Sequence, residues 1–482
     1  MFKKIFNRKS LVVLLAFSAF ILGPTISAQI INPIADIRMD AISPSKYILN
    51  NDNSIYKLLI IAPKNFVKTL QPLIEHKNSV GISTRLVTLT EVYERMFWHG
   101  RDEAEKIKYF IKTAIEDWGI KYVLLVGNFR KMPIRYAYND EPWIHFPEPY
   151  FISELYYADI YDENGDYSSW DSNNNGIFGE WIGEECQDRD IDLYPDVYVG
   201  RLACRNRLEV RIMVKKIIKY ETTTYESDWF NRILAIAGDT YPPGSYDFPT
   251  PDFEGEVNAE TVISYMPGFE NTTLFTSDGT LSGWRDVVRE INNGYGFLFF
   301  DGHANPTSWS THPPNDKSNW TNGLSIFTMA FLKNRNMLPV CVVGGCHNLQ
   351  FDTNLINLLR NFREARWYGT WTPECWGWKL TRILRGGSIA TIGNTGLGMT
   401  KEDKVSKEGA SDYLDSQFFY EFGIDGTDIL GEVWGNAISN YLDKYPIDWD
   451  TNSTSDSAID AKTVQQWALL GDPSLKIGGY SS

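Results

Sequence analysis

The strongest constraint on the fold is a repeated alternation of short apolar runs with segments of helical periodicity. Apolar runs at 57–62 and 122–126 and a β-rich run at 82–89 are separated by two stretches, 66–76 and 102–118, with a helical pattern. Strand-to-strand crossovers of this length are filled by helices, and the strands that they join run parallel. We therefore predict an α/β fold of mainly parallel sheets flanked by helices.

The same alternation returns after residue 226. A helical pattern at 207–225 ends the first series, and further strands are expected at 233–237, 296–300, 338–343 and 388–392, with helical patterns at 257–264 and 284–291. The chain has 482 residues and is 43% hydrophobic, which is enough for a large core. The prediction is two similar α/β subdomains, 56–225 and 226–478.

The first residues have the pattern of an export signal. Basic residues between positions 3 and 9 precede an apolar run from Leu11 to Gly23, and small residues follow at Ser27 and Ala28. We predict a signal peptide over 1–28, a short lead-in over 29–55, and a secreted protein that is extracellular or periplasmic. An uncleaved anchor is the alternative, but the apolar run is shorter than the roughly 20 residues that a membrane span requires.

Charge and cysteine content exclude several classes of partner. The chain has 61 acidic and 46 basic residues, a formal net charge of -15, so nucleic acid and anionic membrane surfaces are not expected partners. Five cysteines are too few for a disulfide framework, and their odd number leaves at least one thiol free. Zinc is not expected, because no Cys-x-x-Cys pair occurs, and no organic cofactor is predicted.

Two of the predicted strands lead into residues suited to nucleophilic catalysis. The run at 296–300 is followed by His303, and the run at 338–343 leads through two glycines to Cys346. Adjacent parallel strands would place both side chains at one sheet edge, where α/β proteins carry their sites. We predict that His303 is the general base and Cys346 the nucleophile, because an imidazole can take the proton of a weakly ionised thiol. The alternatives are a buried structural cysteine and His347 as the base.

The glycines before Cys346 have a second expected role. A glycine turn lets backbone N–H groups approach a reacting carbonyl closely, and the N–H of Cys346 is the expected oxyanion donor. Removal of one such donor typically slows a reaction on the order of a hundredfold or more.

An Asp- and Asn-rich segment predicts a calcium loop. Oxygen donors alternate around a glycine, as calcium loops require, and the expected ligands are Asp171, Asn173, Asn175, Ile177 and Glu180. The closing glutamate stands at the tenth position, which excludes a regular EF-hand. A solvated turn without a metal is the alternative.

Several separated segments resemble the gingipain family of cysteine peptidases, in the caspase-like clan. They are 157–180, 192–202, 295–309 (YGFLFFDGHANPTSW), 343–351 (VGGCHNLQF), 386–395 and 469–477, and they span roughly 55 to 478. The resemblance implies a caspase-like fold in two subdomains, hydrolysis of protein or peptide substrates, His303 as base and Cys346 as nucleophile.

The resemblance also suggests roles for other residues. Asp192 matches an acidic position that helps to form a pocket for Arg or Lys, although it could instead only cap a turn. Ala304 stands where glycine is usual in the clan, and its N–H is the expected second oxyanion donor. Glu180 and Asp301 are the candidates for a third catalytic member that orients His303.

The resulting prediction is a secreted cysteine endopeptidase that acts through a Cys-His dyad and a thioester acyl-enzyme, with Arg or Lys expected before the scissile bond. A catalytically inactive, calcium-stabilised surface or binding protein of the same fold is the first alternative. A secreted glycoside hydrolase is the second, since 16 tryptophans and many carboxylates could serve sugar binding and acid/base work.

Overall fold

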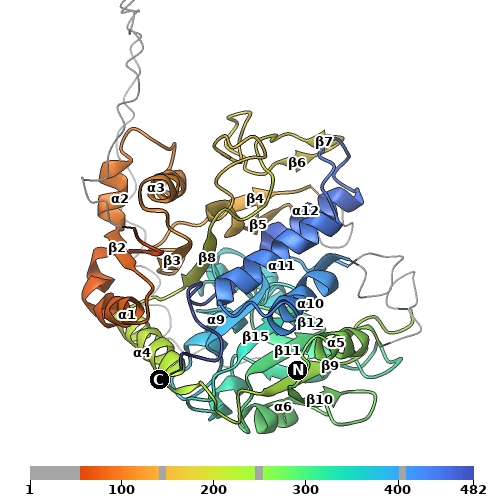
Figure 1. The fold of residues 1–482 in the computed structure, drawn as a ribbon. Helices are drawn as coiled ribbons and strands as arrows, with labels where there is room; N and C mark the ends of the chain where they lie inside the picture. The colour runs from red at the N-terminus through yellow and green to blue at the C-terminus, as the bar shows by residue number, and fades with distance from the viewer. Residues whose placement is uncertain (1–54, 141–147, 245–252, 401–408, 482) are drawn as a thin grey trace, which may run out of the picture. The chain divides into compact units, whose positions relative to one another are not determined.

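The computed structural model describes residues 55–140, 148–244, 253–400 and 409–481 (Figure 1). The predicted signal peptide and nearly all of the lead-in lie outside these residues. None of the helices that the structure describes has both the length and the apolar character needed to cross a membrane.

The first sheet has four parallel strands in the order β2-β1-β3-β8. The strands are β1 (Leu58–Ala62), β2 (Thr84–Thr88), β3 (Tyr122–Val126) and β8 (Tyr198–Leu202), and the helices of this part are α1 (Val67–Ser79), α2 (Leu89–Arg95), α3 (Glu103–Trp118) and α4 (Arg207–Thr223). Every residue of β1 and β3 is buried, which explains their unbroken apolar runs.

Local signals set the bounds of α3. The side chain of Asp102 accepts the N–H of Glu105 at the N-terminus, and Gly119 ends the helix in the left-handed conformation, with φ 68°. Between them, Ile107, Ile111 and Ala114 are buried at helical spacing.

The second sheet has six strands in the order β10-β9-β11-β15-β16-β17, and only β17 runs antiparallel to its neighbour. The strands are β9 (Arg232–Ala237), β10 (Glu270–Phe275), β11 (Phe297–Asp301), β15 (Val340–Val343), β16 (Ala390–Asn394) and β17 (Trp467–Leu470). The main helices of this part are α5 (Glu254–Ser264), α6 (Trp284–Ile291), α9 (Trp376–Arg382), α10 (Ala410–Gly423), α11 (Leu430–Lys444) and α12 (Asp456–Gln466). Helices α10 and α11 pack against each other (Figure 1).

Short elements fill the connections. Two small two-stranded sheets, β4 (Tyr136–Tyr138) with β5 (Tyr150–Ile152) and β6 (Trp181–Ile182) with β7 (Glu185–Cys186), lie in the segment expected to form long loops. A three-stranded sheet follows β11 and consists of β12 (His303–Asn305), β13 (Ser308–Thr311) and β14 (Thr321–Ser325). The remaining short helices are η1 (Lys64–Phe66), η2 (Leu155–Tyr157), η3 (Thr328–Phe331), α7 (Asn357–Arg360) and α8 (Phe362–Trp367).

The two sheets are connected through residues late in the chain. Strand β17 packs against β8 of the first sheet. The buried ammonium of Lys77 on α1 lies 2.8 Å from Glu221 and 2.9 Å from Asp472, just after β17. The α/β class with mainly parallel sheets is therefore confirmed. The division into subdomains at residue 226 stays a prediction, although each sheet draws its strands from one side of it.

Candidate active site

The predicted catalytic residues leave the same edge of the second sheet. Strands β11 and β15 are parallel neighbours, with Phe300 opposite Val343. Gly345 has a φ of 106°, and a Cβ added there would lie 2.8 Å from both the nitrogen of Ala304 and the carbonyl oxygen of Gly302. Only glycine fits so close an approach. The turn before Cys346 thus lies directly against the residues on either side of His303.

The ring of His303 is held by a backbone carbonyl. Its Nε2 atom lies 2.7 Å from the carbonyl oxygen of Thr240, which follows β9. Its ring centroid lies 5.3 Å from that of Trp320 and 5.7 Å from that of His312. Burial is the main cause that lowers the pKa of His303 to about 4; the bond to Thr240 acts in the opposite direction, and His312 adds to the lowering. The imidazole is therefore neutral near pH 7, with Nε2 as the donor and Nδ1 free to accept a proton.

The thiol of Cys346 is partly exposed and protonated in this structure. Burial raises its pKa to about 11; the N–H of Gly398, which donates to Sγ at 3.4 Å, lowers it, Glu148 raises it and Lys462 lowers it. Between residues that the structure describes, no hydrogen bond joins His303 to Cys346. Catalytic hydrogen bonds are often long without substrate and shorten in the substrate complex.

Two asparagines fix the peptide before Cys346. The side-chain amides of Asn348 and Asn394 donate to the carbonyl oxygen of Gly345 at 2.8 Å and 3.0 Å. The N–H of Cys346 belongs to the same trans peptide and so points away from both amides. This N–H has no hydrogen-bond partner among the described residues, so it is available to an oxyanion.

The carboxylate placed beside Cys346 is one that the sequence analysis missed. Glu148 accepts the N–H of Leu397 at 2.8 Å and lies 3.4 Å from Nε2 of His347. Glu148 lies just before β5 and far from Cys346 in the sequence, so no local pattern indicates a role at this site.

Asp192 lies between β7 and β8, and its hydrogen bond is formed within that segment. Its carboxylate accepts the N–H of Tyr194 at 2.9 Å. Burial raises the pKa of Asp192 to about 6; the bond from Tyr194 opposes this shift and the acidic neighbours Asp196 and Asp162 add to it. No hydrogen bond or ion pair between described residues joins Asp192 to the turns that carry His303 and Cys346.

The two candidates for a third catalytic member also have other partners. The carboxylate of Glu180 accepts from the amides of Asn175 at 2.6 Å and Asn173 at 3.3 Å. The carboxylate of Asp301 accepts from Asn258 at 2.7 Å. The group that is bonded to His303 is the carbonyl of Thr240, and a backbone carbonyl has no signature in the sequence.

The segment 171–180 is wound as an oxygen-rich loop. Asp171 accepts the N–H groups of Asn175 and Gly176, and Asn175 accepts that of Ile177. The amide oxygens of Asn173 and Asn175 accept the N–H groups of Asn175 and Ile177, so their amide nitrogens face Glu180. The carboxylates of Asp171 and Glu180 are the oxygen donors in this arrangement that suit calcium. Arg101 lies 2.5 Å from Asp171 and supplies a competing positive charge. Calcium here stays a prediction.

Comparisons with known proteins agree with this architecture. The model of peptidase family C25 matches residues 51–478. Gingipain R2 of Porphyromonas gingivalis is 19% identical over 427 residues, which are 87% of this chain and 46% of the relative. Lys-gingipain HG66 of the same organism is 22% identical over 223 residues, 46% of this chain and 11% of the relative.

Solved structures show the same fold. The crystal structure of gingipain R, described as an Arg-specific cysteine proteinase, matches with a TM-score of 0.60 at 18% identity, over 89% of this chain and 79% of that chain. A complex of the pro- and mature domains of RgpB from Porphyromonas gingivalis has a TM-score of 0.59. The caspase-like fold implied by the resemblance is confirmed. The chain spans less than half the length of the gingipain R1 and R2 sequences that it matches.

Proposed function

Because this chain belongs to peptidase family C25, we propose that it is an active cysteine endopeptidase with Cys346 as nucleophile and His303 as general base. The observation that carries the proposal is the contact of Gly345 with Gly302 and Ala304, which brings the two strand ends together. A structural cysteine would need no such approach to a histidine.

The geometry supports a two-step reaction. Nδ1 of His303 takes the proton of the Cys346 thiol as Sγ attacks the carbonyl carbon of the peptide bond. The N–H of Cys346 donates to the oxyanion, with Ala304 as the candidate for a second donor. The imidazolium returns its proton to the leaving amine, and a thioester remains on Cys346. Water then attacks the thioester, and its proton passes through His303 and restores the thiol.

The proposed substrates are proteins cleaved after Arg or Lys. A basic side chain needs a carboxylate partner. Glu148 is supported by its place beside Cys346, and Asp192 by its resemblance to the family's pocket position. The proposed site of action is outside the cytoplasm, on the basis of the predicted signal peptide at 1–28.

The two alternatives differ in their support. The inactive binding protein is favoured by the protonated thiol and by the missing hydrogen bond between His303 and Cys346 in the described residues. The glycoside hydrolase is not supported by the family, and Trp170 and Trp309, two of the tryptophans that could have served sugar binding, are fully buried.

Peptide hydrolysis by the purified chain tests the proposal. A library varied at the residue before the scissile bond is incubated with the unmutated chain, with Cys346→Ala and with Cys346→Ser, in calcium and reductant. Cleavage that is absent in Cys346→Ala establishes the peptidase. Absence of cleavage by the unmutated chain, before and after limited proteolysis, would favour the binding protein.

A further inference from the structure

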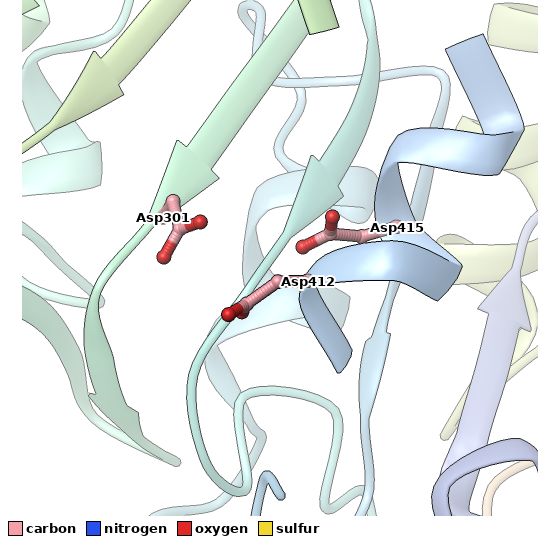
Figure 2. Close-up of side chains that lie close together, drawn as sticks. All are labelled: Asp301, Asp412 and Asp415. Carbon is pink, nitrogen blue, oxygen red and sulfur yellow. The ribbon is translucent and has the colours of Figure 1, made fainter. Parts of the chain in front are cut away.

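Three carboxylates meet below the turns that carry His303 and Cys346. Asp301 ends β11, and Asp412 and Asp415 lie on the first turns of α10, with their side chains directed toward a common space (Figure 2). One oxygen of each lies within 4.8 Å of the others. Asp415 is fully buried and Asp301 is 5% exposed, whereas Asp412 is partly exposed.

Some oxygen atoms in this cluster have no hydrogen-bond donor in the described part of the chain. The amide nitrogen of Asn258 on α5 donates to Asp301 at 2.7 Å and to Asp415 at 3.1 Å. The second oxygen of Asp415 has no hydrogen-bond partner, and neither does the amide oxygen of the fully buried Asn258. No lysine or arginine among the described residues forms an ion pair with any of the three carboxylates.

Repulsion among the three carboxylates destabilises this cluster when no cation is bound. Burial, and after it the charge of Asp301, raises the pKa of Asp412 and of Asp415 well above the usual range. Glu254 on α5 adds a further negative charge beside Asp412. The positive end of the α10 helix dipole offsets only part of this repulsion. Buried carboxylates in such a group must share protons or bind a cation.

We propose that Asp301, Asp412 and Asp415 bind a calcium ion. Calcium takes oxygen ligands at about 2.3–2.6 Å, so two ligands on opposite sides of the ion are up to about 5 Å apart, and the spacing of these oxygens lies within that limit. Magnesium demands near-ideal octahedral geometry and usually keeps several waters, so a largely buried group of protein oxygens suits calcium better. Asn258 supplies a neutral fourth oxygen when its amide is turned, which uses the atom that now lacks a partner.

The ion would tie α10 to both catalytic turns. A Cβ at Gly344 would lie 3.4 Å from the unpartnered oxygen of Asp415 and 3.6 Å from the Cα of Asp301. Gly344 begins the turn to Cys346, and Asp301 stands two residues before His303. Calcium at this position would fix the spacing of the two turns. The site is separate from the 171–180 loop, and the proposal does not depend on peptidase activity.

Calcium binding and thermal unfolding test the site without an activity assay. Chelator-treated protein is titrated with calcium alone by calorimetry, in a Glu180→Gln background that removes the closing ligand of the 171–180 loop. The variants are Asp415→Asn and the milder Asp412→Asn, because Asp412 is partly exposed. Asp425→Asn, at an exposed carboxylate beyond the end of α10, is the control.

The expected result is that calcium reverses the effect of the two substitutions on the Tm. Without calcium, Asp415→Asn and Asp412→Asn should raise the Tm, because they remove repulsion. With calcium, the Tm of both variants should lie below that of the control. Calcium affinity should fall about tenfold or more for each carboxylate lost, since ligand charge sets affinity. Equal Tm gains with and without calcium and unchanged calcium binding would overturn the proposal and show a cluster that holds protons only. If Asp415→Asn does not fold, Asp412→Asn decides alone.

Discussion

The Nε2 atom of His303 lies 2.7 Å from the carbonyl oxygen of Thr240, and this contact determines which ring nitrogen carries the proton. A carbonyl only accepts, so Nε2 donates and Nδ1 is the basic nitrogen. A backbone group thereby provides the orienting contact that was expected from Glu180 or Asp301.

The two candidates for the general base, His303 and His347, should respond differently to mutation. His303→Ala should lower kcat by about 10²–10⁴-fold, the usual contribution of a general base. His347→Ala should lower kcat less, because His347 has a φ of 55° and lies beside Glu148 instead of the turn at 302–304. Both are measured with one peptide substrate at saturation, and a larger loss in His347→Ala would reverse the assignment.

Thiol alkylation should identify Cys346 as the reactive cysteine. The other four cysteines, Cys186, Cys204, Cys341 and Cys375, are buried, and burial raises the pKa of each of them. Iodoacetamide reacts with the thiolate. Its rate at Cys346 should therefore keep rising toward pH 11, where the pKa lies. Glu148→Gln removes a charge that raises this pKa and should speed the reaction at pH 8. A rate that levels off near pH 7 would show a pre-formed thiolate, contrary to this structure.

The acid that recognises a basic side chain can be found by a pair of matched substitutions. Loss of a hydrogen bond to a charged group costs about 1.5–3 kcal/mol, which corresponds to roughly 10–100-fold in kcat/KM. If Glu148 holds the substrate, Glu148→Gln should show this loss for Arg and Lys peptides and a smaller loss for neutral ones, and Asp192→Asn should not. The opposite result would assign the pocket to Asp192, and equal losses on all peptides would remove both.

Calcium removal should loosen the 171–180 loop. If calcium binds there, a chelator should create a proteolytic cut within this segment, and Glu180→Gln should give the same cut in the presence of calcium. Mapping the fragments by mass spectrometry locates the cut. An unchanged cleavage pattern would mean that Arg101, bonded to Asp171 and Asn174, already supplies the positive charge that the loop needs.

The buried ion pair of Arg201 and Glu154 should contribute strongly to stability. Arg201 is fully buried, lies 2.6 Å from Glu154 and also donates to the carbonyls of Gly127, Met132 and Pro133. Arg201→Met leaves a buried carboxylate unpaired, which costs about 3–5 kcal/mol of unfolding free energy.

An exposed ion pair provides the control for this measurement. Arg232 and Glu270 pair across β9 and β10, and Arg232→Met should cost less than about 1 kcal/mol. Both variants are compared by urea unfolding. A similar small loss in each would show that the Arg201 network relaxes on mutation.

The sequence predicted the central strands well because they are buried on both faces. β1, β3 and β15 are continuous apolar runs, and β11 is apolar up to its last residue, Asp301; the strand ends placed His303 and Cys346 correctly at one edge. Strand β10 was missed, because it is an edge strand in which only Leu274 and Phe275 are buried, and its sequence, ENTTLF, carries little apolar pattern.

Other features were hidden for different physical reasons. In α10, polar residues such as Ser411, Asp415 and Gln417 are buried together with Phe418 and Phe419, so the helix has no polar face to reveal its period. The positions of Glu148 and Thr240 beside the predicted catalytic residues result from tertiary contacts between distant segments. No spacing within the sequence reports such contacts.

The antiparallel pairing of β17 with β16 has a consequence for the order of synthesis. A ribosome delivers His303 and Cys346 long before residues 467–470, yet the edge of the second sheet and its contact with β8 require those residues. The ion pair between Lys77 and Asp472 likewise joins a segment that is translated early to one that is translated late. A nascent chain therefore carries His303 and Cys346 before the scaffold that aligns them can close, so the proposed activity would arrive only when translation has passed residue 472.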